Sequence, residues 1–170
     1  MSKMTKLTLD QVNGMNAEEF NKTLGWIVEH SPWVIEGVEP HRPFSSIQQF
    51  HDELVKLIML SSTEQKLHLL RQHPDLGSRM QMTAASVSEQ KGAGLDQLNP
   101  TEYDQLLSLN KQYVSKFGFP FILSVRGHTK ESILAALSSR LNNEGAAELE
   151  EALQQIARIT RLRMEDLVLT

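Results

Sequence analysis

Apolar residues recur three and four positions apart along most of the chain, which is the spacing that places side chains on one face of an α-helix. The clearest case follows Ser45 and Ser46, where apolar side chains keep this spacing as far as Leu60. Comparable patterns begin at residues that suit a helix N-terminus, because their side chains accept hydrogen bonds from backbone N–H groups there. These predicted starts are Asn16, Ser31, Ser62, Asn99 and Thr129, and a last helical pattern follows Gly145.

The segment from Phe117 to Arg126 departs from this helical pattern. It is apolar and partly β-branched, and it contains Gly118 and Pro120, which disfavour a helix. By residue preference it is the one plausible strand in the sequence, but a single strand has no partner. We therefore expect extended chain here, or a short buried helix after Pro120.

The sequence predicts an all-α fold: a single compact domain over residues 1–170, with roughly seven to nine helices and irregular active-site loops. A chain of 170 residues with 40% hydrophobic and 22% charged residues has the length and composition of one globular domain. Connectors marked by proline, such as residues 39–43, favour a globular bundle of helices over a coiled coil.

Composition argues against several classes of protein. The formal net charge is −4 and no long basic run occurs, so we expect no nucleic-acid partner. There are no cysteines, which excludes disulfides, thiolate nucleophiles and cysteine-ligated zinc. The N-terminus lacks the apolar core of a signal peptide, and no run approaches the roughly 18 apolar residues of a membrane span. We therefore expect a cytoplasmic protein without a membrane segment.

The six histidines do not have the spacing of a metal site. His68 and His73 are too far apart in sequence to share one helical face, and the H-E-x-x-H pattern is absent. The sequence therefore predicts neither a structural nor a catalytic metal.

Side chains suited to catalysis and binding gather between residues 71 and 96. His73 stands directly before Pro74, where a helical pattern stops, and a Ser-x-x-Glu-Gln group at 86–90 precedes Gly-Ala-Gly. Irregular segments held by a rigid scaffold often carry such groups. Two simpler interpretations stay open. His73 suits a helix C-terminus because of the helix dipole, and Ser86 with Glu89 is also the pattern of a capping box.

Five motifs, in this order and spacing, resemble the OHCU decarboxylase family. They are H-P-D-L at 73–76, S-x-x-E-Q at 86–90, G-A-G-L at 92–95, L-x-x-L-N-x-x-Y at 106–113 and F-G-F-P-F-I at 117–122. Upstream, F-x-x-x-L-G-W-I-V-E-H-S-P-W at 20–33 and R-P-F at 42–44 resemble the N-terminal signature of the family. The resemblance covers nearly the whole chain. It departs at Gly77, where many members have Ala, and in a short link between the first two motifs.

The resemblance implies an all-α enzyme, often a homodimer, that needs no cofactor. The family decarboxylates 2-oxo-4-hydroxy-4-carboxy-5-ureidoimidazoline to (S)-allantoin in the breakdown of urate. By position, His73 matches the catalytic histidine, and Glu89 is the second catalytic candidate. The implied substrate-binding residues are Pro74, Ser86, Val87, Ser88, Glu89, Gln90, Phe121, Ile122, Leu123, Ser124, Val125 and Arg126. For residues 121–125 the resemblance implies an extended segment whose backbone lines the pocket and holds the substrate.

The chemistry of this substrate suits these residues. Its carboxylate and hydroxyl share a ring carbon beside a C=N bond, so the imine can accept the electron pair left by departing CO2. Imidazole titrates near neutrality, which suits His73 to proton transfer. Glu89 offers acceptor oxygens for paired N–H groups of the substrate, and Gln90 offers a donor and an acceptor. Arg126 could hold the carboxylate, but tight binding of the leaving group would stabilise the ground state.

Two other classes of function remain compatible with the residues. One is a ureide hydrolase, or a metal-assisted hydrolase that uses His68 and His73. The other is a non-catalytic helical ligand-binding module in which His73 and Glu89 serve only the ends of helices.

Overall fold

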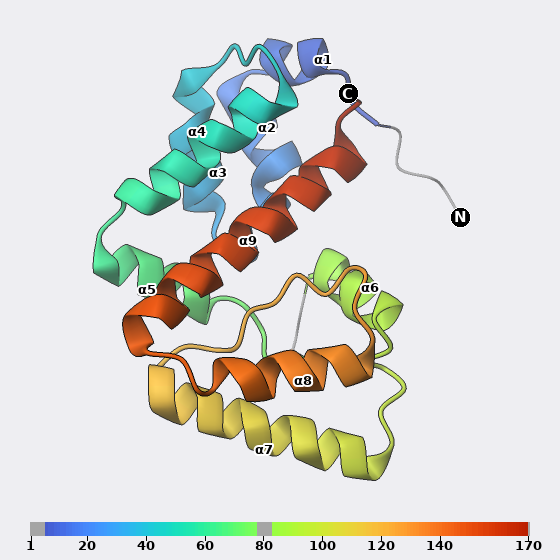
Figure 1. Ribbon diagram of the computed structural model, residues 1–170. Coiled ribbons are helices and arrows are strands. Elements are labelled where there is room, and N and C mark those ends of the chain that lie inside the picture. Colours follow the sequence, from blue (N-terminus) through green and yellow to red (C-terminus); the bar gives the residue numbers. More distant parts are fainter. Residues whose placement is uncertain (1–5, 78–82, 170) are drawn as a thin grey trace. The chain divides into compact units, whose positions relative to one another are not determined.

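Helices make up most of the regular structure in the computed structural model, which describes residues 6–77 and 83–169 (Figure 1). Within these residues the α-helices are α1 Leu9–Gly14, α2 Ala17–Leu24, α3 Pro32–Val38, α4 Ile47–Leu60, α5 Thr63–Arg71, α6 Ala84–Gly92, α7 Pro100–Phe117, α8 Lys130–Arg140 and α9 Gly145–Leu167. Two short 3-10 helices, Gly25–Ile27 and Glu39–His41, flank α3. The described residues contain no β-sheet, only an isolated bridge between Leu7 and Val168. The prediction of an all-α fold is confirmed.

Local capping explains why several helices begin where they do. The hydroxyl of Ser46 accepts a hydrogen bond from the Gln49 N–H at 3.0 Å in front of α4. Asn99 and Glu102 form a reciprocal capping box in front of α7, with side chain to backbone distances of 2.8 and 3.0 Å. Equivalent bonds are made by Asn16, Ser62 and Thr129. These predicted helix starts are therefore confirmed.

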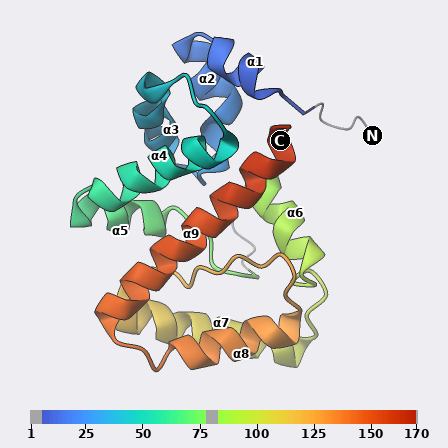
Figure 2. The same cartoon turned by 45° about the horizontal axis from the view of Figure 1, so that its top comes forward.

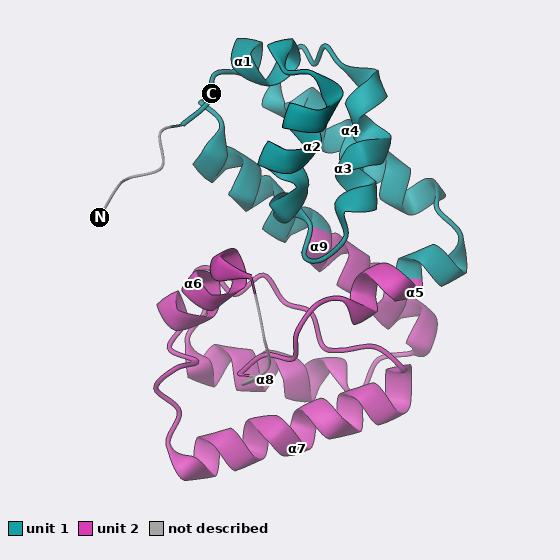
Figure 3. Cartoon of the chain, turned by 180° about the vertical axis from the view of Figure 1, so that it is seen from behind, with its two compact units in different colours: residues 1–66, 157–170 teal, residues 67–156 magenta. Residues whose placement is uncertain are grey.

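By its internal contacts the chain divides into two compact units (Figure 3). Unit 1 consists of residues 1–66 and 157–170, and unit 2 consists of residues 67–156. Helices α5 and α9 each have residues in both units. The single domain expected over residues 1–170 stays a prediction.

Unit 1 packs around three phenylalanine rings. The rings of Phe44 and Phe50 stack with centroids 4.6 Å apart, and the ring of Phe20 lies 6.0 Å from that of Phe50. The guanidinium of Arg42 lies 4.4 Å from the centre of the Phe20 ring and donates a hydrogen bond to the Val12 carbonyl at 2.9 Å. This arginine thus joins the aromatic core to a carbonyl of α1.

Unit 2 contains α6, α7, α8 and the segment that connects α7 to α8. Helices α7 and α8 run side by side in both views (Figure 1, Figure 2). The Tyr113 ring on α7 packs against Phe119 and Phe121 of the connecting segment, at centroid distances of 5.9 and 5.4 Å. Helix α7 ends at Phe117, and Gly118 caps it with a φ of 81°, in the left-handed region that ends many helices. Residues 119–125 are then buried and non-helical, which agrees with extended chain rather than a helix after Pro120.

Candidate active site

The predicted site residues all lie in unit 2, on three pieces of chain. These are the loop 73–77 after α5, helix α6, and the segment 119–126 between α7 and α8. Arg71 in the last turn of α5 donates a hydrogen bond to the Gly118 carbonyl at 3.0 Å. The chain just before the first piece is thereby held beside the chain just before the third.

The loop that carries His73 is fixed from two sides. His73 is 9% exposed, and its backbone N–H donates to the Leu70 carbonyl at 3.2 Å, so it continues the chain just beyond the last residue of α5. The side-chain oxygen of Gln90 on α6 accepts from the Gly77 N–H at 3.0 Å. Asn110 on α7 donates to the Leu76 carbonyl at 3.1 Å. A buried histidine on a loop held at its far end by two helices has the fixed position that catalysis requires.

The structure explains why position 77 is a glycine. Its φ is 73°, and a Cβ added there would lie 2.5 Å from a methyl carbon of Leu106. Glycine therefore suits the position, and the expected departure from the resembled family at Gly77 has a local structural reason. The short link that follows, residues 78–82, lies outside the described residues.

Helix α6 contradicts two expectations for the S-x-x-E-Q group, namely irregular backbone and a helix cap at Ser86. The helix spans Ala84–Gly92, and Thr83 is its N-cap, with the Thr83 hydroxyl accepting from the Ser86 N–H at 3.3 Å. Thr83 is a good cap and two alanines follow it directly, so the helix begins about one turn earlier than the Ser86 pattern indicates.

The helical geometry of α6 separates the side chains of the S-x-x-E-Q group. Ser86 and Gln90, four positions apart on one face, are buried, and Glu89 beside them is half-buried. Val87 is 48% exposed and Ser88 is also exposed. Ser86, Glu89 and Gln90 are therefore the members of this group whose side chains lie toward the interior of unit 2.

The third piece of the predicted site is buried along its length. The predicted lining residues are each at most 8% exposed, whereas the following Arg126 is exposed; the buried ones are Phe121, Ile122, Leu123, Ser124 and Val125. Arg140 of α8 donates to the Ile122 carbonyl at 2.6 Å, and the side-chain oxygen of Gln155 on α9 accepts from the Ser124 N–H at 2.9 Å. The backbone polar groups of this non-helical segment thus find partners on two neighbouring helices.

A buried ionic cluster contacts this segment through Arg140. Glu148 of α9 is fully buried and accepts hydrogen bonds from Arg140 at 2.8 and 3.1 Å, from Asn143 at 2.8 Å and from the Tyr113 hydroxyl. Burial raises the pKa of Glu148, but these hydrogen bonds together outweigh it and lower the pKa below its ordinary value. Burial and the Glu148 hydrogen bond raise the pKa of Tyr113 far above its ordinary value, so the phenol stays a proton donor.

Sequence reasoning missed several residues that shape this region. Asn110 is part of the L-x-x-L-N-x-x-Y motif, but the motif did not indicate which group its side chain would bind. A stronger signal existed for Arg140 and Glu148, because each places a charge on an otherwise apolar helical face, Arg140 after Ile133 and Leu137. Asp75, beside Pro74, is half-buried, and burial raises the pKa of its carboxyl. The other missed residue is Gln155.

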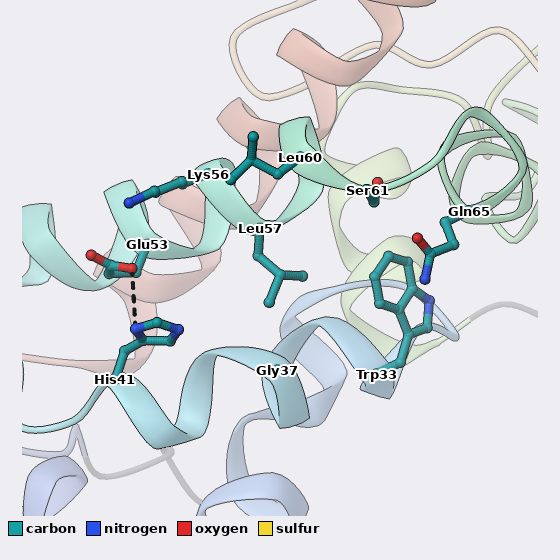
Figure 4. Close-up of a pocket in the computed structure, with 9 residues that line it drawn as sticks. All are labelled: Trp33, Gly37, His41, Glu53, Lys56, Leu57, Leu60, Ser61 and Gln65. Atoms are coloured by element: carbon teal, nitrogen blue, oxygen red, sulfur yellow. Dashed lines mark ion pairs between the residues drawn. The ribbon is translucent and has the colours of Figure 1, made fainter.

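A separate hollow lies in unit 1, between α3 and α4 (Figure 4). It has a volume of about 390 Å³, and its lining residues fall between Trp33 and Gln65. His41 and Glu53 form an ion pair across 3.5 Å at one end. The hollow is therefore formed by residues other than those of the predicted site.

Two further observations concern metals and membranes. Among residues 6–77 and 83–169, no group of three or more His, Asp or Glu side chains is placed to hold a metal ion. No helix in the same part of the chain is both long and apolar enough to cross a bilayer.

Comparisons with known proteins give one consistent result. The family model described as OHCU decarboxylase matches residues 13–165. The uric acid degradation bifunctional protein PucL of Bacillus subtilis is 42% identical over 161 residues, which are 95% of this chain and 33% of that protein. The 2-oxo-4-hydroxy-4-carboxy-5-ureidoimidazoline decarboxylase of Haloferax volcanii is 39% identical, over 96% of this chain and 97% of its own.

The fold is also similar to that of solved structures. A crystal structure of OHCU decarboxylase in the presence of (S)-allantoin superposes with a TM-score of 0.72 at 25% identity, covering 90% of this chain and 98% of the other. The chain thus spans about a third of the bifunctional protein but nearly the full length of the Haloferax volcanii protein and of the chain in this crystal structure.

Proposed function

The chain belongs to the OHCU decarboxylase family, and from this premise we propose that it converts 2-oxo-4-hydroxy-4-carboxy-5-ureidoimidazoline to (S)-allantoin and CO2. The observation that carries the proposal is the match of the family model to residues 13–165 of 170. The relative from Haloferax volcanii, which bears the name of this activity and matches along 97% of its length, supports the same reaction for a chain of this size.

The reaction needs electrons to be accepted and protons to be moved. The bond from the ring carbon to its carboxylate breaks, and the electron pair forms a C=C bond to the neighbouring ring carbon. The imine π pair moves to nitrogen, which takes up a proton. Transfer of the hydroxyl proton to the neighbouring carbon then gives the carbonyl and the C–H bond of allantoin. The face on which that carbon is protonated fixes the stereochemistry, so the protein must hold both the ring and a proton-transfer group.

We assign proton transfer to His73 and recognition of the ureido or ring N–H groups to Glu89. His73 is supported by its burial on a loop held by Gln90 and Asn110, and Glu89 by its place beside the buried face of α6. The remaining contacts are proposed for Pro74, for the α6 residues 86–90 and for the segment 121–126. The Gln90 oxygen already accepts from Gly77, so Gln90 also holds the loop that carries His73.

The same family membership is the basis for proposals on cofactors, assembly and location. No cofactor takes part in the proposed reaction, because the imine of the substrate accepts the electron pair. We further propose that the chain acts as a homodimer in the cytoplasm. Analytical ultracentrifugation of the purified protein would test the assembly.

The test of the function uses freshly oxidised urate, which supplies the unstable substrate in place. Stopped-flow absorbance would follow the decay of the substrate, and circular dichroism would follow the optical activity of the allantoin formed. We expect faster decay and (S)-allantoin with the protein, and slow formation of racemic allantoin with heat-inactivated protein. Racemic allantoin at the uncatalysed rate in the presence of folded protein would overturn the proposal.

A further inference from the structure

Two buried side chains hold the peptide groups on either side of Leu123. Arg140 donates to the carbonyl of Ile122 at 2.6 Å, which belongs to the peptide group before Leu123. Gln155 accepts from the N–H of Ser124 at 2.9 Å, which belongs to the peptide group after Leu123. Both side chains are themselves buried, at 8% and 7% exposure. The orientation of Leu123 is therefore set from outside the segment, by α8 and α9.

The Arg140 contact is rigid because the guanidinium is held on several sides. Its Nε and Nη2 atoms bind the Glu148 carboxylate, while Nη1 reaches Ile122. The centre of the guanidinium also lies 4.6 Å from the centre of the Phe121 ring. A planar, forked donor held in this way offers its remaining N–H in one fixed direction.

The Gln155 contact is rigid for a similar reason. Its side-chain N–H donates to the Glu151 carboxylate at 2.8 Å, one turn earlier on α9, while its oxygen faces the Ser124 N–H. The carboxamide therefore cannot rotate without losing a hydrogen bond.

The two contacts fix the directions in which the N–H and C=O groups of Leu123 point. In a trans peptide group the C=O and N–H point in opposite directions. Because the Ile122 carbonyl points to Arg140, the Leu123 N–H points away from Arg140. Because the Ser124 N–H points to Gln155, the Leu123 carbonyl points away from Gln155. In the described part of the chain, neither backbone group of Leu123 takes part in a hydrogen bond.

We propose that Arg140 and Gln155 are positioning residues that aim the N–H and C=O of Leu123 at the cyclic amide of the substrate. A donor and an acceptor on one residue match the adjacent C=O and N–H of a ring amide, as they match an opposing residue in a β-bridge. This inference rests on the proposed function and names the backbone pair within the segment 121–125 that recognises the ring. Arg140 and Gln155 act through the backbone and do not touch the substrate.

The test compares Gln155→Met with Gln154→Met. Gln154 is exposed and makes the same bond one turn back, to Glu150 at 3.0 Å, so its variant matches the loss of that bond on α9 but neither loses the Ser124 contact nor changes a buried side chain. We expect Gln155→Met to raise KM about two- to tenfold, the worth of a typical hydrogen bond, with kcat within about twofold of wild type. Gln154→Met should leave both constants unchanged.

Binding of two ligands separates positioning from mere stability. Wild type should bind (S)-allantoin more tightly than an allantoin methylated at N3, the ring N–H that the substrate also carries, and Gln155→Met should narrow that preference. A variant that is only less stable would keep the preference while its unfolding temperature falls, and this result would overturn the inference. If Gln155→Met does not fold, Arg140→Lys serves instead, because lysine keeps the charge beside Glu148 but not the forked geometry.

Measurements on the wild-type protein alone also test the inference. Equal affinity for the two ligands would overturn the inference whatever the variants do. Failure of the proposed function gives a different result, because wild type would then not accelerate decay of the substrate at all.

Discussion

At the scale of single residues, the position of His73 combines burial with restraint. The residue follows α5 directly, and the loop beyond it is held by the side chains of Gln90 and Asn110. Positioned acid–base groups depend on such restraint, because a displacement of about 1 Å can cost a large part of the rate. A helix end alone would not require the two additional side chains that hold the loop.

His73→Asn should remove most of the enzymatic rate while the protein folds normally. Asparagine keeps hydrogen-bonding capacity and is tolerated near helix C-termini, so the change removes proton transfer more than structure. Positioned acid–base groups contribute on the order of 10²–10⁴-fold, and the loss of kcat should fall in that range. Stopped-flow decay of the substrate measures it.

The matched control is His68→Asn, on the exposed side of α5. It should leave the rate unchanged, whereas a metal-assisted hydrolase using both histidines would lose activity in either variant. Retention of more than about a tenth of the activity in His73→Asn would contradict the proton-transfer role.

Glu89→Gln should weaken binding of (S)-allantoin and leave the fold intact. The change keeps the shape of the side chain but replaces an acceptor oxygen by a donor that faces the N–H groups of the ligand. A hydrogen bond to a charged partner is worth about 1.5–3 kcal/mol, so affinity should fall roughly ten- to a hundredfold. Isothermal titration calorimetry measures it, with the exposed Glu131→Gln as control. An unchanged dissociation constant would mean that Glu89 serves only α6.

Single residues differed in how far the sequence revealed them. His73 and Glu89 could be selected because their motifs are contiguous in sequence. Asn110 and Gln155 could not, because each acts through one hydrogen bond to backbone more than 30 positions away. Which backbone group a carboxamide will meet depends on the tertiary fold, and no local pattern records it.

At the scale of elements, the buried cluster around Glu148 joins three helices and a loop-like segment. Tyr113 belongs to α7, Arg140 to α8 and Glu148 to α9, while Arg140 also reaches the Ile122 carbonyl. A buried ion pair adds little over well-packed apolar residues, but removing one partner leaves a buried charge uncompensated. The cluster therefore specifies how these helices meet more than it adds stability.

Glu148→Gln should destabilise the protein at pH 7 by about 3–5 kcal/mol, the usual cost of breaking a buried pair. The pKa of Glu148 is lowered in the folded state, so its ionised form stabilises the fold above the ordinary carboxyl pKa of about 4.5. That contribution is lost as pH falls through the lowered pKa. The difference in unfolding free energy between wild type and variant should therefore narrow in acid, as urea unfolding at several pH values would show.

The exposed Glu144→Gln, one turn before Glu148, is the control and should change stability by less than about 0.5 kcal/mol at every pH. The raised pKa of Asp75 has the opposite sign, because its ionised form is disfavoured by burial, but it is present in both proteins and cancels. A difference that stayed constant from pH 7 into acid would contradict the assigned role of the Glu148 charge.

Helix starts were predictable because capping is local. Ser46 and Asn99 each act on an N–H three positions away, within the reach of a sequence pattern. Helix α6 shows the limit of this reasoning, since Ser86 and Glu89 satisfy the capping pattern but Thr83 caps the helix. When two candidate caps lie within one turn, the better helix formers between them decide, and here these residues favour the earlier start.

At the scale of the whole molecule, α9 is a single helix from Gly145 to Leu167, and the division between the two units falls within it, after residue 156. The division between the units depends on contacts between residues distant in sequence. The regular spacing of apolar residues along α9 therefore did not predict it. A helix propagates cooperatively, because each added residue gains a bond at the cost of one residue fixed. Disorder on one side of residue 156 would therefore remove the hydrogen bonds that join it to the adjoining turn on the other side.

We accordingly expect the two units to unfold in one transition, which also tests the prediction of a single domain. Both tryptophans, Trp26 and Trp33, belong to unit 1, so tryptophan fluorescence reports that unit alone. Ile133→Val removes one methylene from a fully buried position of α8 in unit 2, at a cost of about 0.5–1.5 kcal/mol. At about 2–4 °C per kcal/mol, the unfolding midpoint should fall by roughly 1–6 °C.

The shift should be the same by tryptophan fluorescence, which sees unit 1, and by far-UV circular dichroism, which sees all helices. Ile35→Val, at a fully buried position of α3 in unit 1, is the matched control and should shift both signals alike. If the units unfold separately, Ile133→Val will leave the fluorescence transition in place while Ile35→Val moves it, and circular dichroism will show two steps. That pattern would replace the single domain by two, joined through α5 and α9.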